Sequence, residues 1–404
     1  MLSMNNFFFG ASLSAHQSEG NNTHSDWWDF EEKTLKPAGK DVSGQATNHW
    51  EMYEEDFHLA HQIGHNATRL SLEWAKIEPE QGQINYDVIN HYKRVFEALS
   101  KNNLTPFVTI LHFTLPKWFA DMGGFENREN IRHFSNYCKL IGNTFRDELK
   151  HIITINEPEI YAYHGYLIKK WPPLKGSWGL FNKIIKNLAI AHNQAYEDLK
   201  AIKPDFQIGV AKNNQFFLPD RPNNPLDHLI AAFFRKHWNF KFLDYIKKHQ
   251  DFIGLNYYFY RCVRADVHLA EQFCQISYPT PRKTDMDWEV YPKGLYLMIK
   301  EISKRYKKPI IITENGVADH QDKLREDVIK EGLYWVFKAR EEGIDVFGYL
   351  HWALTDNYEW DSGFTPKFGL IKIDYEDNFI RTVRPSALLY RDLIKKYQKQ
   401  LEEK

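Results

Sequence analysis

The sequence of 404 residues contains very little cysteine. Its three cysteines, Cys138, Cys262 and Cys274, include no CxxC pair and form no even set that could build a disulfide framework. This usage is typical of a reducing compartment, so we expect a cytoplasmic protein. Long apolar runs are also missing. The three Phe at positions 7–9 follow no Lys or Arg and are too few for a signal peptide or a membrane span.

An excess of charge of either sign is absent as well. The 52 Lys and Arg stand against 53 Asp and Glu, so no net field attracts phosphate backbones or anionic lipid. We therefore predict neither a nucleic-acid nor a membrane partner, and the composition makes no prediction of oligomeric state. Aromatic residues are abundant at 15%, with 12 Trp. They fit either a sugar site, where flat rings meet sugar C–H faces, or additional core.

Eight short apolar or β-branched runs recur along the chain, each followed by a longer stretch of helical periodicity. The runs cover residues 7–12, 67–74, 105–112, 152–157, 207–212, 252–258, 309–314 and 346–352. Helical patterns cover residues 86–99, 131–145, 184–199 and 328–341, and loops are expected over 20–45, 167–179 and 264–287. This alternation predicts an α/β protein with a single (β/α)8 barrel domain over residues 1–404. An open doubly wound sheet is the alternative, but no GxGxxG or Walker loop follows any run.

Polar or aromatic residues stand where the predicted strands end. They are Trp74 after Arg69, His112, Asn156-Glu157, Asn256 with Tyr258, Glu314-Asn315 and Trp352. The carboxyl ends of the strands converge on the active-site face of such a barrel, so catalytic residues are expected there.

Two of these residues are carboxylic acids. Pro158 should bias Glu157 toward extended geometry at the end of its strand. The same Glu-Pro pattern would also fit a surface carboxylate at the start of a helix. Glu314 closes a buried apolar strand before an Asn-Gly turn, and it could instead be a structural partner of Arg69. Two carboxyl groups roughly 5 to 5.5 Å apart across a barrel mouth would hydrolyse a glycosidic bond with retention.

The motifs around these positions resemble glycoside hydrolase family 1, the β-glucosidase family, from Phe9 to about Leu393. The matching segments are 9–12 (FGAS), 17–20 (QSEG), 69–74 (RLSLEW), 111–116 (LHFTLP), 154–158 (TINEP), 251–258 (DFIGLNYY), 313–316 (TENG) and 351–360 (HWALTDNYEW). The resemblance implies a retaining β-glycosidase that acts on a small-molecule β-glycoside or oligosaccharide without cofactor or metal. It favours a β-glucosidase with galactosidase or fucosidase side activity.

The resemblance also implies roles for individual residues. Glu157 would be the general acid/base and Glu314 the nucleophile, with Arg69, Tyr258 and Asn256 orienting Glu314. Trp288 would contact the aglycone. The residues implied for the glycone are Gln17, His112, Asn156, Trp352, Glu359, Trp360 and Phe368.

Three positions depart from the family pattern: His16 stands where Tyr is common, Ala353 where Ser is usual, and Asp287 where Gly is usual. Two rival functions stay open beside the main one. A 6-phospho-β-glycosidase would carry Ser in place of Glu359, whose charge would repel phosphate. A non-catalytic sugar-binding homologue would be expected to lack one catalytic Glu. A metal-dependent barrel hydrolase is disfavoured because the 18 His form no HxH motif.

Overall fold

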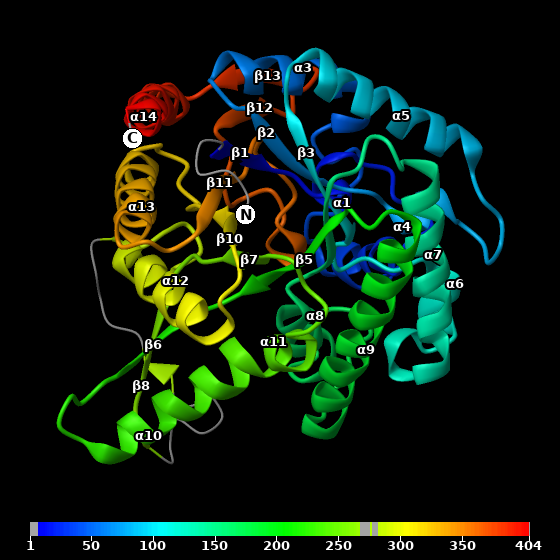
Figure 1. Ribbon diagram of the computed structural model, residues 1–404. Coiled ribbons are helices and arrows are strands. Elements are labelled where there is room, and N and C mark those ends of the chain that lie inside the picture. The colour runs from blue at the N-terminus through cyan, green and yellow to red at the C-terminus, as the bar shows by residue number, and fades with distance from the viewer. Residues whose placement is uncertain (1–6, 267–274, 277–281, 404) are drawn as a thin grey trace.

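A computed structural model describes residues 7–266, 275–276 and 282–403 (Figure 1). Eight parallel strands close into a barrel in the order β1, β11, β10, β7, β5, β4, β3, β2. Their bounds are β1 Phe8–Ser12, β2 Ala67–Ser71, β3 Thr105–Leu111, β4 His151–Asn156, β5 Gln207–Asn213, β7 Ile253–Asn256, β10 Ile310–Asn315 and β11 Val346–Trp352. Each predicted run contributes one strand, so the (β/α)8 prediction is confirmed.

Helices surround the barrel (Figure 1). The longer ones are α3 His49–Gln62, α5 Tyr86–Lys101, α7 Ile131–Thr144, α8 Pro158–Tyr166, α9 Trp178–Ile202, α10 Pro225–Phe234, α12 Pro292–Tyr306, α13 Leu324–Glu341 and α14 Pro385–Glu402. The four predicted helical patterns correspond to α5, α7, α9 and α13. None of the helices in the described ranges is both long and apolar enough to cross a membrane.

Three local predictions were wrong. Strand β2 ends at Ser71 because the Glu73 side chain accepts a hydrogen bond from the Ala75 amide and caps a short helix, α4 Trp74–Ile77. Trp74 consequently stacks on Tyr137 in the core and not at a strand end. The expected loop over 20–45 contains helix α2 Asp26–Phe30, which is capped by Ser25 and followed by the π-helix η1 Glu31–Leu35 and the 3-10 helix η2 Lys36–Ala38.

Two small sheets outside the barrel were not predicted. Strands β6 Phe216–Pro219, β8 Tyr260–Val263 and β9 Gln275–Ile276 form one, and the hairpin β12 Ile371–Asp374 and β13 Ile380–Val383 forms the other. Strand β9 lies within the expected loop 264–287, of which 267–274, with Cys274, and 277–281 fall outside the described residues. In Figure 1, β6, β8 and α10 extend together from one side of the barrel.

The barrel interior is apolar in the first half of the strands and polar at their ends. Side chains such as Phe107, Ile153 and Ile311 pack there as a separate buried cluster. This packed layer closes the barrel below, so the polar residues at the carboxyl ends face a cavity that opens on one side only.

A buried ion pair ties the β12–β13 hairpin to α3. Arg381 donates from Nε to Asp56 Oδ1 at 2.9 Å and from Nη2 to Oδ2 at 3.1 Å, and His49 Nδ1 lies 2.7 Å from Oδ2. Neither Arg381 nor Asp56 has solvent-exposed side-chain surface.

Replacing Asp56 should therefore be costly. Asp56→Asn leaves the Arg381 cation buried without its counter-charge, and the apparent free energy of unfolding in urea should fall by about 3–5 kcal/mol. The matched control is Asp121→Asn, which removes an exposed partner of Lys117 and should cost about 1 kcal/mol or less. Equal losses in both variants would contradict the structural importance of the buried pair.

Candidate active site

A cavity of about 670 Å³ opens at the carboxyl ends of the barrel strands. All of the site residues predicted from the sequence line it except Arg69 and Asn256, which lie directly beneath. Its inner end holds three carboxyl groups, those of Glu157, Glu314 and Glu359.

Two side chains donate hydrogen bonds to Glu314. Arg69 donates from Nη1 to Glu314 Oε1, and Tyr258 Oη donates to Oε2 at 2.5 Å. Both oxygens therefore accept hydrogen bonds, one of them from a cation, which stabilises the ionised form of the carboxyl group. The register of β10 shifts between Ile312 and Glu314. Such an irregularity can re-aim a side chain next to an active site.

The turn after Glu314 brings two backbones close together. A Cβ on Gly316 would lie 1.9 Å from the Trp352 carbonyl oxygen. Only glycine fits this approach, so the Asn315-Gly316 turn places β10 directly against the end of β11, where Trp352 lies.

Glu157 does not have the extended geometry that its proline neighbour suggested. Its φ and ψ are 41° and 61°, in the left-handed region, and Pro158 begins α8 directly after it. Phe113 and Trp360, which also line the cavity, have positive φ values of 70° and 52°. Such conformations cost about 1–3 kcal/mol each and cluster at functional sites.

The hydrogen bonds of Glu157 locate its proton. Asn213 and Asn256 both donate their amide NH2 groups to Oε1, at 3.1 and 2.8 Å. Because Oε1 accepts twice, a proton on this carboxyl group belongs on Oε2. Burial, with a further contribution from the negative charge of Glu314, raises the pKa of Glu157 to about 8.

Glu359 also has a raised pKa. Burial and the charges of Glu314 and Glu157 raise it to about 8, although Gln17 donates from Nε2 to Oε2 at 3.2 Å. Like charges in one buried space disfavour the ionisation of all three carboxyl groups together. The negative charge expected at Glu359 stays a prediction.

Asn156 fixes the orientation of His112. Its Oδ1 accepts from Arg69 Nη2 at 2.8 Å and from Asn256 Nδ2 at 3.3 Å, so its amide NH2 must be the donor to His112 Nε2 at 3.2 Å. Burial lowers the pKa of His112 well below its usual range, and the neutral ring carries its hydrogen on Nδ1.

Aromatic rings form the walls around these groups. Trp352 and Trp360 lie nearly parallel to the His112 ring, with centroids 6.0 and 6.2 Å away. Trp288 packs against Tyr258 and Phe368 at 5.5 and 6.0 Å. Asp287, the residue before Trp288, has a φ of 56°, in the left-handed region. Glycine adopts this region most readily, which agrees with the Gly that the family pattern has at this position.

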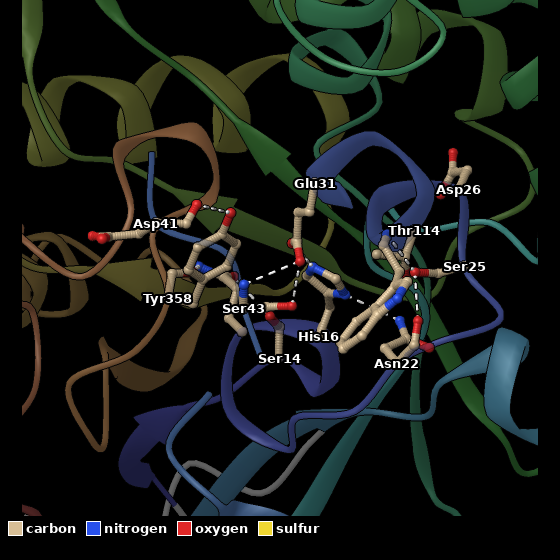
Figure 2. Close-up of polar contacts among 12 residues, drawn as sticks. Ser14, His16, Asn22, Ser25, Asp26, Glu31, Asp41, Ser43, Thr114 and Tyr358 are labelled. Carbon is tan, nitrogen blue, oxygen red and sulfur yellow. Dashed lines mark hydrogen bonds and ion pairs between the residues drawn. The ribbon is translucent and has the colours of Figure 1, made fainter. Parts of the chain in front are cut away.

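His16, the first departure from the family pattern, lies in a buried polar network behind Trp360. Figure 2 shows it between Glu31, whose Oε1 is 2.8 Å from Nε2, and Asn22, whose Nδ2 is 3.1 Å from Nδ1. Ser43 donates to the other Glu31 oxygen through its amide and hydroxyl groups. The His16 ring stacks on Trp360 at 5.5 Å, so this network supports the cavity wall from outside.

Sequence reasoning missed several functional neighbours. Asn213 lies one residue beyond the predicted end of its strand, and the strand-end rule would have found it had the strand been extended. Lys212 Nζ and Glu159 Oε2 form a buried pair 3.1 Å apart. Glu159 follows Glu157 by two residues in α8, and Lys212 precedes Asn213, the hydrogen-bond partner of Glu157, in β5. Trp171, which stacks against His164, gave no signal because it lies in an irregular segment.

Among the described residues, no group of three or more His, Cys, Asp or Glu side chains is placed to hold a metal ion.

Known proteins match this chain over nearly its whole length. The family model described as "Glycosyl hydrolase family 1" matches residues 3–244 and 241–399. The chain is similar to a β-glycosidase from Pyrococcus horikoshii, at 38% identity and TM-score 0.90, over 98% of this chain and 95% of that one. It is 29% identical to β-glucosidase A from Thermotoga maritima, over 96% of this chain and 97% of that protein. It is 28% identical to a β-galactosidase from Sulfolobus acidocaldarius, over 96% and 94%.

The coupling of the three carboxyl groups can be measured. Glu314→Gln removes the negative charge beside Glu157 and Glu359, so the pKa of each should fall from about 8 while burial keeps it above 4.5. Carbon-13 NMR titration of labelled glutamate would follow both groups. Glu159, with a pKa raised to about 7 chiefly by burial, is the internal control and should not move. Unchanged titration of both Glu157 and Glu359 would show that Glu314 does not influence them.

Proposed function

Because this chain belongs to glycosyl hydrolase family 1, we propose that it hydrolyses β-glycosides with Glu314 as the nucleophile and Glu157 as the acid/base. The observation that carries the assignment is the contrast between the two carboxyl groups. Glu314 accepts from a guanidinium and a phenol, whereas Glu157 accepts only amide donors on one oxygen and has a raised pKa. Opposite environments suit opposite roles in acid–base chemistry.

The reaction then follows in two displacements. The Glu314 carboxylate attacks the anomeric carbon while Glu157 Oε2 gives its proton to the glycosidic oxygen, and the aglycone leaves as an alcohol. The Glu157 carboxylate next takes a proton from water, whose oxygen attacks the glycosyl ester and releases Glu314. Two inversions at the same carbon give net retention. Asn213 and Asn256 serve both steps because an amide donor to Oε1 stabilises either protonation state of Glu157.

The glycone would lie over Trp352, with hydroxyl groups bound by Gln17, His112 and Glu359. A neutral His112 offers its Nδ1–H as a donor, and no protein partner for Nδ1 exists among the described residues. The Glu359 carboxyl group can accept from sugar hydroxyl groups, and in its protonated form it can also donate. The relatives named β-glucosidase and β-galactosidase support glucosides as substrates with galactosides as a second class.

Phosphorylated sugars are disfavoured by the carboxyl groups at the inner end of the cavity. A 6-phosphate would add negative charge to a buried space already holding the Glu314 anion, and it would shift Glu359 further toward its neutral form. The low cysteine content continues to favour a cytoplasmic location.

The nucleophile can be trapped. A 2-deoxy-2-fluoro-β-glucoside with an activated leaving group should form a stable ester with Glu314, because fluorine slows the second displacement. Peptide mass spectrometry should find the added glycosyl mass on a peptide containing Glu314. An ester on any other residue would refute the assignment.

The acid/base has a different signature. Glu157→Gln should slow alkyl glucosides, which need protonation, by about 10²–10⁴-fold, and activated aryl glucosides much less in the first displacement. Azide, which needs no base, should restore turnover of the activated substrates and give a β-glycosyl azide. Equal losses on both substrate types, without azide rescue, would argue against the role of Glu157.

A further inference from the structure

The outer half of the active-site cavity differs in charge from the inner end. Its outer wall comes from outside the barrel ladder, from α8, α9, β6, α10 and β8, and is largely apolar. Three cations also line the cavity, those of Lys170, Lys241 and Arg261. Apart from the three inner glutamates, Asp361 is the one carboxylic acid among the described lining residues, and it pairs with Lys170 at 3.0 Å. The outer half therefore holds more cations than carboxylates.

Arg261, in β8, is the lining cation without a polar partner. Its Nε is buried and accepts no partner, and the side chain makes no hydrogen bond or ion pair with the described residues. The buried guanidinium groups of Arg69, Arg381 and Arg384, by contrast, each pair with a carboxylate. Burial lowers the pKa of Arg261, against smaller opposing effects of neighbouring acidic groups. A desolvated cation of this kind is costly unless a counter-charge is bound to it.

The position of Arg261 follows from a chain of ring contacts that begins at the proposed nucleophile. Tyr258, which donates to Glu314, packs against Trp288, the residue expected to contact the aglycone. Trp288 packs against Phe259 at 4.7 Å, and Arg261 Cζ lies 4.5 Å from the centroid of the Phe259 ring. A cation–π contact uses the charge of a guanidinium but none of its N–H donors. Arg261 thus keeps its donors for a group just beyond the first ring of an aglycone.

The other polar groups of the outer half leave Arg261 as the main site for an anion. Lys241 already donates to Asn182 Oδ1 at 2.6 Å. Burial, with smaller contributions from neighbouring cations, lowers the pKa of His164 to about 3. Its ring is therefore neutral, and its buried Nδ1 has no hydrogen-bond partner among the described residues. His164 can add a hydrogen bond to a bound group but no charge.

We propose that Arg261 binds a carboxylate carried by the aglycone, so that the preferred substrates are β-glycosides whose aglycone is an anion. The planar guanidinium matches a carboxylate through two parallel hydrogen bonds, which are strongest where water is excluded. Without this cation, the negative charge at the inner end of the cavity would repel such an aglycone. The inference rests on the proposed function, because the sugar must lie at Glu157 and Glu314 for the aglycone to reach Arg261.

Two substrates of nearly equal size test the inference, 4-carboxyphenyl β-glucoside and its amide, 4-carbamoylphenyl β-glucoside. The amide group withdraws electrons more strongly than a carboxylate and gives the better leaving group. A higher kcat/KM for the acid therefore reports binding and not easier chemistry. At neutral pH and low salt we expect kcat/KM to be about 10- to 100-fold higher for the acid, the effect of hydrogen bonds to a charged group. A ratio of one or less would overturn the inference.

Variants locate the anion. Arg261→Gln should reduce the acid-to-amide ratio of kcat/KM by about tenfold or more, because the charge and the paired donors are lost together. The matched control is Lys236→Gln, which removes an exposed cation from the nearby π-helix η5 Arg235–Phe240 outside the cavity lining. This control should preserve the ratio. Equal ratios in both variants would show that Arg261 does not bind the carboxylate.

Binding without turnover separates this inference from the proposed function and needs only the wild-type protein. Calorimetry should give a lower Kd for 4-carboxyphenyl β-thioglucoside, which resists hydrolysis, than for its amide. Tighter binding of the acid in a protein that hydrolyses neither glucoside would support the anion site and refute the function. Hydrolysis with equal binding of the two thioglucosides would do the reverse. Comparing cellobiose with a β-linked disaccharide of glucose and a uronic acid distinguishes a sugar acid from an aromatic acid as the source of the carboxylate.

Discussion

The buried guanidinium of Arg69 is the group on which the site depends. A cation with no exposed surface costs several kcal/mol unless partners satisfy it, and here its donors reach Thr109, Asn156 and Glu314 on three other barrel strands. Each contact has a further consequence. The pairing stabilises the anion of Glu314, and occupying Asn156 Oδ1 turns its amide toward His112. One side chain thus sets the charge of one residue and the tautomer of another.

The three carboxyl groups at the inner end differ in their hydrogen-bond partners. Glu314 accepts from a cation and a phenol, while Glu157 and Glu359 accept from amide groups. Burial raises the pKa of the latter two, with a contribution from the charge of Glu314. The proposed assignment of acid and nucleophile follows from partner chemistry, since Glu157 and Glu314 are both buried.

Much of this was predictable from sequence because it depends on local signals. Short apolar or β-branched runs predicted all eight barrel strands, and the rule that strand ends converge predicted Glu157, Glu314 and His112 as site residues. What failed depended on specific long-range or backbone effects. The raised pKa of Glu359 depends in part on Glu314 and Glu157, which lie far away in the sequence, and the left-handed conformation of Glu157 opposes the bias expected from Pro158. Trp74 was misplaced because a side-chain cap by Glu73 outweighed the strand pattern.

The fold separates the carboxyl groups at the inner end of the cavity from its outer wall. Glu157 is anchored by its own amide donating to the Ala211 carbonyl at 2.7 Å, and the Glu314 carbonyl accepts from the Tyr257 amide at 2.9 Å, so both belong to the barrel ladder. The outer wall includes residues of α10 and β6, which lie outside that ladder (Figure 1). Substitutions in the wall can change its shape and polarity without shifting the register that holds the carboxyl groups. The barrel geometry and the apolar wall can therefore vary independently, because no backbone hydrogen bond of the barrel has to change when the wall does.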